Sequence, residues 1–134
     1  MTPLEAAWMP PSDTVTTFAM DWIAAWNDHD VDRILAHYRD DVVFTSPFVT
    51  MHAFAADGVV HGRDALRRYF VRALSNYPDL RFEPIAVVPG VDSVALHYRS
   101  VGGREAIEVM ELDEERRVRR VNVHYTTPAD STGA

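Results

Sequence analysis

Glu108 is the residue of this 134-residue chain whose position most directly suggests chemistry. It lies in the run Arg104–Leu112, where strand alternation puts Ala106, Glu108 and Met110 on one face. A carboxylate between apolar neighbours on a concave wall loses hydration, and this loss raises its pKa. A carboxyl group that titrates near neutral pH suits a general acid or base. We therefore predict that Glu108 is the catalytic residue.

Two other readings of this glutamate stay open at the level of the sequence. Glu108 could pair with an arginine such as Arg99 and serve the structure alone. A slip of one residue would turn Glu111 inward instead, because successive side chains of a strand point to opposite faces. The catalytic prediction therefore depends on which face of one strand is concave.

Six further side chains are predicted to contact a bound molecule. Trp22 and Tyr38 fall at core spacing, and core packing is their alternative role, yet a buried indole or phenol needs a hydrogen-bond partner. Ser46 sits where an apolar strand ends, and His52 lies in an apolar loop that faces the mouth. For His97 the pattern leaves open which face of its strand is concave. The predicted binding residues are Trp22, Tyr38, Ser46, His52, His97 and Tyr125.

The composition excludes several classes of chemistry. The chain has no cysteine, and all 13 of its basic residues are arginine. Disulfide scaffolds, thiolate zinc sites, Schiff-base lysines and P-loops are therefore excluded. A net charge of −7 argues against nucleic acid as a partner. His29 between Asp28 and Asp30 suits the capping of a helix–helix turn, and no second histidine stands at ligand spacing, so no metal site is expected.

The pattern of apolar residues predicts helices first and strands afterwards, which indicates an α+β fold. A short strand, Val42–Ser46, ends at Pro47 and is followed by an apolar loop over 48–62. The predicted helices run from Ser12 or Asp13 to about Asn27, over Val31 to Tyr38 with Ile34 and Leu35 on the same face, and from Arg63 or Asp64 to just before Pro78. The later predicted strands are Leu80–Val88, Ser93–Val101, Arg104–Leu112 and Val118–Tyr125.

The organisation of the chain is predicted to be simple. We expect one domain over residues 1–134, with an ordered core at about 13–126 and frayed ends. No signal peptide is visible and no apolar run approaches the roughly 18 residues of a membrane span, so we expect a cytoplasmic protein without a membrane partner. The charged run Glu114–Arg120 is expected to form a solvated, ion-paired edge.

The order of elements and several short motifs resemble the cone-shaped nuclear transport factor 2-like fold, in its SnoaL-like branch. The motifs are AAWNDHDVD at 24–32, YRDDVVF at 38–44, SP at 46–47 and HGRDAL at 61–66. The resemblance implies three helices packed in a strongly bent antiparallel sheet, with an internal apolar pocket for a small hydrophobic molecule. It also implies a homodimer through the outer face of the sheet, and chemistry without a metal or an organic cofactor.

The fold hosts several activities, so the site residues must decide between them. In the register that resembles ketosteroid isomerase, the Asp base falls on Ser46, the Tyr donor on Trp22 and the second donor on Glu108. Only the last role is kept. The Asp–Arg–Asp network of limonene epoxide hydrolase is not matched either, since Ala106 and Met110 flank Glu108. Resemblance to the polyketide cyclases leaves Glu108 as the acid/base group.

These observations predict a protein that binds a small hydrophobic organic molecule and catalyses cofactor-free cyclisation, isomerisation or epoxide opening. The alternative is a non-catalytic binding or dimerisation module, favoured by the serine that stands at the base position, Ser46. The outward residues Ile107 and Val109 make the outer sheet face apolar enough to bury against a second copy.

Overall fold

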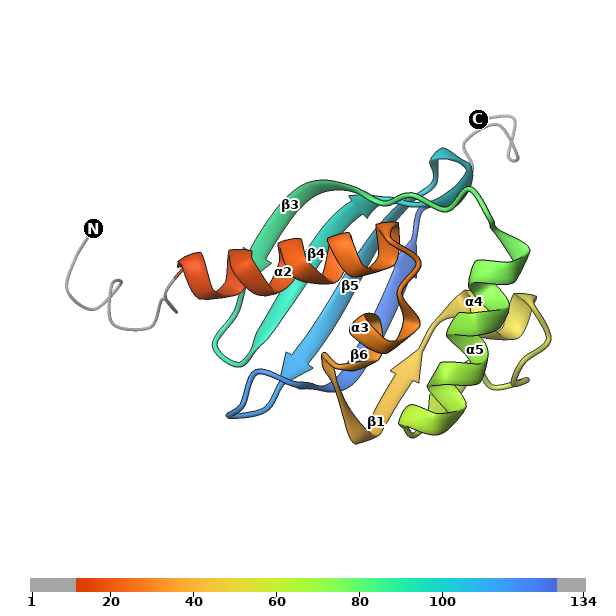
Figure 1. The fold of residues 1–134 in the computed structure, drawn as a ribbon, viewed down its shortest axis with the longest axis horizontal. Helices are drawn as coiled ribbons and strands as arrows, with labels where there is room; N and C mark the ends of the chain where they lie inside the picture. The colour runs from red at the N-terminus through yellow and green to blue at the C-terminus, as the bar shows by residue number, and fades with distance from the viewer. Residues whose placement is uncertain (1–11, 128–134) are drawn as a thin grey trace.

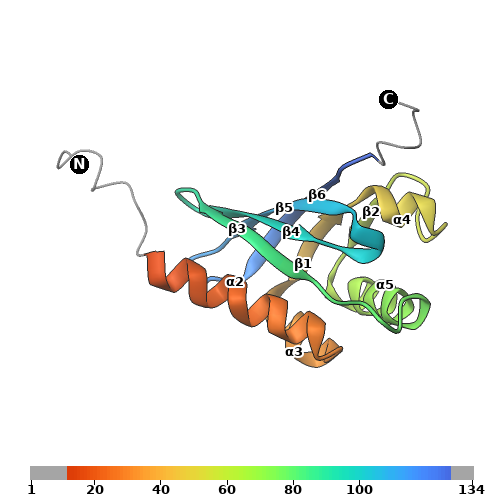
Figure 2. The same cartoon turned by 90° about the horizontal axis from the view of Figure 1, so that it is seen from above.

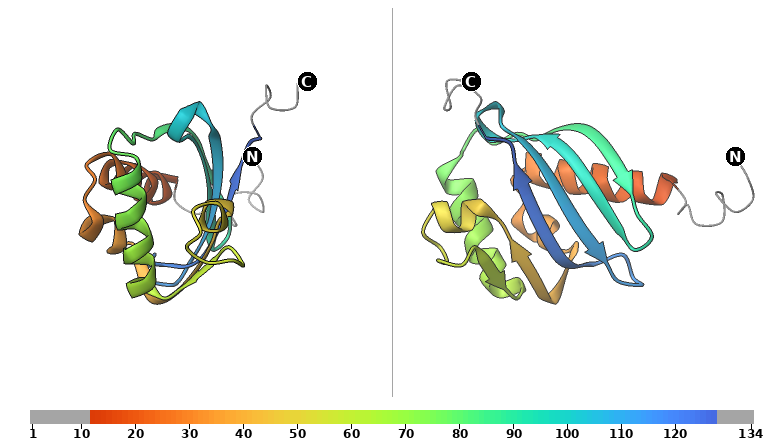
Figure 3. Two further views of the ribbon diagram at one scale, coloured as in Figure 1. Left: turned by 90° about the vertical axis from the view of Figure 1, so that its right-hand side faces the viewer. Right: turned by 180° about the vertical axis from the view of Figure 1, so that it is seen from behind.

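The computed structural model describes residues 12–127, which form a curved six-stranded sheet with α2, α3 and α5 on one side (Figure 1, Figure 3). The helices are α2 (Ser12–Asn27), α3 (Val31–Leu35), α4 (Pro47–Met51) and α5 (Arg63–Asn76), with a 3-10 turn η1 (Val101–Gly103). The strands are β1 (Tyr38–Thr45), β2 (Val59–His61), β3 (Glu83–Pro89), β4 (Ser93–Arg99), β5 (Glu105–Leu112) and β6 (Val118–Tyr125). The expectation of frayed ends falls mainly on residues 1–11 and 128–134, outside the described part of the chain.

The sheet has the strand order β2-β1-β6-β5-β4-β3, so β5 and β6 occupy its middle. Strands β3 to β6 form the antiparallel meander that the sequence predicts, and the α+β fold class is confirmed. The pairing of β1 with β6 is parallel, which the sequence pattern did not indicate. Because β5 is paired on both sides along its length, the facing of each of its side chains is fixed.

The helices cover the concave side of the sheet, with α2 lying across the meander and α5 beside β1 (Figure 1, Figure 2). Apolar residues three and four positions apart give each helix one buried face. On α2 these are Val15, Ala19, Trp22, Ile23 and Trp26; on α5 they are Leu66, Tyr69 and Phe70. Among residues 12–127, no helix combines the length and the apolar character of a membrane-crossing segment.

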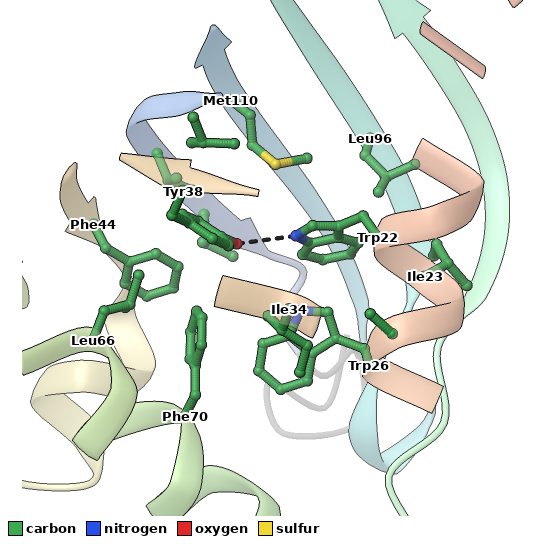
Figure 4. Packing of buried hydrophobic residues seen from close by; sticks show 14 of the residues in the cluster. Trp22, Ile23, Trp26, Ile34, Tyr38, Phe44, Leu66, Phe70, Leu96 and Met110 are labelled. Carbon is green, nitrogen blue, oxygen red and sulfur yellow. Dashed lines mark hydrogen bonds between the residues drawn. The ribbon is translucent and has the colours of Figure 1, made fainter. Parts of the chain in front are cut away.

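Aromatic side chains from both layers meet in the core. Figure 4 shows Trp22 and Trp26 of α2 reaching toward Tyr38 and Phe44 of β1 and toward Phe70 of α5. The ring centroids of Trp26 and Phe70 are 4.7 Å apart in an edge-to-face arrangement, and those of Phe44 and Phe70 are 5.5 Å apart. Helices and sheet are thus joined through one aromatic cluster.

Strand β1 begins four residues earlier than predicted. Tyr38, expected on a helix, already pairs with Val118 of β6, and the register then shifts before Val43. This irregularity lets Asp40 and Asp41 sit within the strand while both remain exposed to solvent. The acidic pair therefore belongs to the part of β1 that does not pair with β2.

The apolar segment expected to be a loop contains two regular elements. Pro47 does end β1, but it does so as the first residue of helix α4, a position that proline favours. Ser46 is the N-cap, and its Oγ accepts a hydrogen bond of 3.2 Å from the backbone nitrogen of Phe48. Residues 59–61 then form β2, the outermost strand next to β1.

Candidate active site around Glu108

Glu108 points to the concave side of β5, as strand alternation predicts. Its neighbours on that face, Ala106 and Met110, are buried, and Glu108 itself is 3% exposed. In the sheet it stands opposite Leu96 of β4 and Val123 of β6, both buried and apolar. The carboxyl group is thus surrounded by apolar side chains within the sheet.

The alternative placements of this strand are excluded by its contacts. Glu111 lies on the outer side and accepts a hydrogen bond of 3.1 Å from Arg119, so the register has not slipped. Arg99 is exposed, and within residues 12–127 no ion pair involves Glu108. The glutamate is therefore not a member of a structural ion pair with Arg99.

Tyr98 is the direct partner of this carboxyl group. Its hydroxyl donates a hydrogen bond of 2.7 Å to Oε1 of Glu108, and both side chains are buried. Burial raises the pKa of Glu108 to about 7, while the Tyr98 hydroxyl acts in the opposite direction by stabilising the carboxylate. Near neutral pH the group is populated in both protonation states, the condition that favours a general acid or base.

Tyr125 extends the hydroxyl lining beside Glu108. Tyr98, Ala106 and Tyr125 stand opposite one another on β4, β5 and β6, and the small Ala106 leaves room for a ring on either side. Burial, assisted by the charge of Glu108, raises the pKa of both tyrosines well above the usual value. The same two causes raise the pKa of Tyr69 on α5. These phenols therefore stay protonated and can donate hydrogen bonds.

A cavity of about 50 Å³, called the inner cavity below, lies against Glu108. It holds only a few water-sized groups, since one water needs roughly 10–15 Å³ of such space. The wall is mostly aromatic, so a larger molecule enters only when side chains move. The lining residues are Trp22, Trp26, Phe44, Phe48, His52, Tyr69, Phe70, Ala73, Tyr77, Leu80, Phe82, Tyr98, Ser100, Val101, Glu108 and Tyr125.

Three of the predicted binding residues line this cavity: Trp22, His52 and Tyr125. Nε1 of Trp22 donates a hydrogen bond of 2.9 Å to Oη of Tyr38, so the indole nitrogen is already partnered. Nε2 of His52 lies 3.0 Å from Oη of Tyr77. The ring of Tyr125 stacks on Phe48 with a centroid distance of 4.2 Å. The mouth is thus closed by aromatic contacts.

Two predicted residues lie behind the cavity wall and do not line it. Tyr38 is fully buried and contacts the cavity wall through its hydrogen bond with Trp22 and its edge-to-face packing on Phe70. Burial, together with the charge of Glu108, raises its pKa well above the usual value. Ser46 is also buried, and its hydroxyl caps α4. Both support the site rather than form its surface.

The structure places His97, whose facing the sequence left open, on the outer side of the sheet. Leu96 and Tyr98 take the inner side of β4, so His97 between them points outward. There its Nε2 lies 2.7 Å from Oε1 of Glu105, and neither residue lines the inner cavity. His124 also faces outward, because it follows the inward-facing Val123 on the same strand.

The turn that holds His29 serves the structure. Oδ1 of Asp30 accepts a hydrogen bond of 3.1 Å from the backbone nitrogen of Arg33 and caps α3, as predicted. Nε2 of His29 lies 2.9 Å from the carbonyl oxygen of Leu80. Among residues 12–127, no group of three or more acidic, histidine or cysteine side chains is placed to hold a metal ion.

Sequence reasoning missed Tyr98 as a site residue, although parity with Leu96 places it on the inner face of its strand. What the sequence does not give is the pairing of Tyr98 with Ala106, which brings the phenol within reach of Glu108 two residues further along β5. Trp26 also lines the inner cavity, and its ring packs edge-to-face against Phe70. Its Nε1 is the single buried side-chain nitrogen or oxygen of the described residues without a hydrogen-bond partner.

The family model of the SnoaL-like domain matches residues 19–133, most of the chain. The chain belongs to the SnoaL-like family. The resemblance read from the sequence is thereby confirmed. A search of curated proteins finds no match.

Solved structures of SnoaL-like proteins share this fold. A SnoaL-like protein of unknown function from Burkholderia thailandensis is 41% identical, with a TM-score of 0.83 over 87% of this chain and 98% of its own. SalBIII, an epoxide hydrolase/cyclase-like enzyme of pyran ring formation in the polyether salinomycin, is 20% identical, with a TM-score of 0.70 over 89% of this chain and 95% of its own. An Agrobacterium tumefaciens member proposed to be an isomerase is 16% identical, with a TM-score of 0.68 over 84% of this chain and 97% of its own. The last two show the fold alone.

In this SnoaL-like protein the geometry offers one proton carrier and several hydroxyl donors. Glu108 lines the inner cavity; Tyr98 bonds its Oε1, and no described residue forms a hydrogen bond with its Oε2. The deprotonated carboxyl can accept a proton there, and the protonated form can return it. The apolar wall keeps water away and so strengthens each of these interactions.

Proposed function

We propose that this SnoaL-like protein catalyses cofactor-independent proton transfer on a small, largely apolar organic molecule, with Glu108 as the acid/base group. One observation carries the proposal: a buried carboxyl with a pKa of about 7 lines a cavity and is bonded to a phenol, with no cationic partner among the described residues. Carboxylates that serve the structure are instead often paired with cations, as Asp41 is with Arg39 and Asp32 with Arg67.

The reaction is one in which a proton leaves one position of the substrate and returns at another. For a substrate with a carbonyl group and a carbon–carbon double bond in the β,γ position, the Glu108 carboxylate takes a proton from the α carbon between them and a dienolate forms. The resulting carboxylic acid then protonates the dienolate at the γ carbon, so the double bond moves into conjugation and the enzyme ends as it began. In a ring closure, the proton passes from an attacking hydroxyl group to Glu108 and then to the oxygen released.

Two structural relatives support this class of chemistry. SalBIII is described as epoxide hydrolase/cyclase-like, and the Agrobacterium protein is proposed as an isomerase. Cyclisation and isomerisation both move a proton within one substrate and need no redox cofactor. A hydroxyl donor near the developing oxyanion favours such steps, and the protonated Tyr125 at the cavity wall supplies one.

A second candidate function is ligand binding without catalysis. It is favoured by the small inner cavity, which aromatic side chains nearly fill. It is also favoured by Ser46, whose hydroxyl is engaged as the cap of α4 where a catalytic acid stands in ketosteroid isomerase. In this case Glu108 would bind the ligand through a hydrogen bond and move no proton.

We also propose that the protein forms a homodimer through the outer face of the sheet. Ile107, at the centre of β5, is 44% exposed on that face, and it stands between His97 and His124 of the neighbouring strands. Burial of this apolar residue against a second copy would remove it from water.

Exchange of carbon-bound protons with deuterium tests the catalytic proposal. Cyclohexanone and 4-phenylbutan-2-one are incubated with the protein in D₂O, beside hydroxy-epoxides as ring-closure probes, and followed by NMR. We expect conversion of at least one probe by the parent protein, slowed roughly a hundredfold or more in Glu108→Gln. Glu111→Gln, the same change on the outer face of the same strand, is the matched control and should remain active. Equal rates in parent and Glu108→Gln would overturn the proposal.

A further inference from the structure

A surface groove of about 370 Å³, called the mouth groove below, adjoins the inner cavity. Four residues line both spaces: Tyr77, Leu80, Ser100 and Val101. The groove continues between the segment 76–81, which follows α5, and the turn η1. A molecule that enters by this route leaves its outer part in the groove.

The two volumes constrain the shape of such a molecule. The inner cavity, at about 50 Å³, accepts a small reacting end next to Glu108. The groove, at about 370 Å³, has room for the larger remainder. A ligand that fills both is elongated, with its reacting end inside and its other end at the surface.

Three arginines surround the mouth. Arg81 lines the groove itself. The guanidinium carbon of Arg104 lies 5.5 Å from the ring centroid of Phe48, which lines the inner cavity. Arg72 donates a hydrogen bond of 2.7 Å to the carbonyl oxygen of His52, another cavity residue. Positive charge is therefore gathered at the entrance of a protein whose net charge is −7.

The three arginines at the mouth are not neutralised by a carboxylate of the described residues. Within residues 12–127, Arg72, Arg81 and Arg104 form no ion pair, and Asp79 is the one acidic residue that lines the groove. Arg68, Arg99, Arg116 and Arg120 also form no ion pair within residues 12–127, while six other arginines pair with nearby carboxylates. Those in ion pairs are Arg33, Arg39, Arg63, Arg67, Arg117 and Arg119.

We propose that the molecule accepted by this site is an elongated organic anion, whose apolar end reaches Glu108 and whose carboxylate or phosphate group remains in the mouth groove near Arg81 and Arg104. The inference rests on the proposed function, because it takes the inner cavity as the place of reaction. It adds the substrate class, which Glu108 and Tyr98 alone do not define.

Electrostatics fixes the orientation of such a ligand. A second anion beside the buried Glu108 would meet a like charge in a place that water does not reach, which is costly. At the mouth the anionic group keeps part of its hydration and gains guanidinium donors, whose planar fork matches a carboxylate or a phosphate. The neutral end therefore enters first, and the reacting atoms arrive at Oε2 of Glu108.

Binding of three matched probes tests this inference. The probes are 4-phenylbutanoate, its neutral isostere 5-phenylpentan-2-one, and 3-phenylpropyl phosphate, each titrated into ¹⁵N-labelled protein at low ionic strength. We expect at least one anion to bind about tenfold more tightly than the ketone, and added salt to reduce the difference. The two anions distinguish a carboxylate ligand from a phosphate ligand.

Charge variants assign the preference to the mouth. In the double variant Arg81→Gln, Arg104→Gln the preference for the anion should fall to about twofold or less. Arg116→Gln is the matched control, because Arg116 lies in the β5–β6 turn; it neither lines the mouth groove, as Arg81 does, nor stacks on a residue of the inner cavity, as Arg104 does on Phe48. Equal affinity for anion and ketone, absence of binding by all three probes, or a preference that survives in the double variant would overturn the inference.

The variant Glu108→Gln separates this inference from the proposed function. It removes the acid/base group but leaves the mouth arginines in place, so the anion preference should persist. If the protein prefers the anions but moves no proton on any probe, the inferred ligand class stands and the catalytic role of Glu108 is overturned. If it catalyses exchange on the ketones but shows no preference for anions, the catalytic role stands and the inferred ligand class is overturned.

Discussion

The hydroxyl of Tyr98 donates a hydrogen bond of 2.7 Å to Oε1 of Glu108 across the pairing of β4 with β5. The two groups are buried together, and the phenol is the only polar side chain that bonds this carboxyl among residues 12–127. A single neutral donor offsets part of the cost of burying a carboxylate, and the pKa of Glu108 accordingly stays raised, at about 7. The pair therefore keeps the carboxyl in a state that can take up or release a proton near neutral pH.

Stability should fall as the pH rises through the range in which Glu108 ionises only in the unfolded chain. The pKa rises from 4.5 to about 7 on folding, so between these values the folded protein holds a proton that the unfolded chain has lost. The free energy of unfolding should decrease across this window by about 3 kcal/mol. Urea unfolding at about pH 5 and about pH 8 gives the change in the free energy of unfolding between the two pH values. The contribution of Glu108 is the difference between this change in the parent protein and the change in Glu108→Gln. Parallel dependences would contradict it.

Removal of the Tyr98 hydroxyl should raise the pKa of Glu108 further. In Tyr98→Phe the carboxylate loses its hydrogen bond while burial is unchanged, so the charged form is less favourable. NMR titration of the ¹³C-labelled carboxyl group reports the shift directly. Tyr77→Phe is a suitable control, because that hydroxyl bonds His52 at the mouth and should leave the titration of Glu108 where it is.

The fold could be predicted well where the pattern depends on local periodicity. The spacing of Trp22 and Trp26 on α2 and the alternation around Glu108 each follow from the geometry of one element, and both are confirmed. The start of β1 could not be predicted in this way. Tyr38 becomes a strand residue because it pairs with Val118, 80 positions later, and no local signal reports such a pairing.

The site could be predicted only in part, for a related reason. The alternation of side chains along a strand predicted that Glu108 and Tyr125 face inward. The same alternation could not decide the facing of His97, which depends on the pairing of β4 with β5. The link from Tyr98 to Glu108 also requires the register between β4 and β5. The capping role of Ser46 could not be predicted, because a serine at the end of a strand and a serine at the start of a helix occupy the same position before Pro47.

Ser46→Ala should destabilise the protein without changing the chemistry of Glu108. The hydroxyl caps α4, and loss of a cap costs about 1 kcal/mol. Ser46→Asp retains an acceptor at the N-cap and serves as the comparison for the capping effect. Thermal and urea unfolding give the stability, and the deuterium-exchange assay gives the activity. If Ser46→Ala kept its stability but lost activity, the hydroxyl would act on the substrate instead.

Ile107→Asp should convert a dimer into a monomer. The side chain is 44% exposed at the centre of the outer sheet face, and a charge there cannot be buried against a second copy without a partner. Size-exclusion chromatography with light scattering measures the mass of the parent and the variant. Val91→Asp is the matched control, because Val91 is 78% exposed in the turn between β3 and β4. A monomeric parent protein would contradict the dimer directly.

Phe48→Ala should open the route to the inner cavity. Phe48 stacks on Tyr125 at a centroid distance of 4.2 Å and lies beneath the guanidinium of Arg104, so these three side chains close one side of the mouth. Truncation removes an aromatic pair worth about 1 kcal/mol and should therefore cost a similar amount of stability. Because entry no longer requires the ring to move, the association rate of 4-phenylbutanoate should rise roughly tenfold.

Stopped-flow tryptophan fluorescence measures this rate, since Trp22 and Trp26 line the cavity. Phe54→Ala is the control: Phe54 packs edge-to-face on Tyr69 at 5.3 Å, but it does not line the inner cavity. It should lose stability as Phe48→Ala does and keep the slow association of the parent protein. Acceleration in both variants would mean that general loosening, and not the Phe48–Tyr125 contact, controls entry to Glu108.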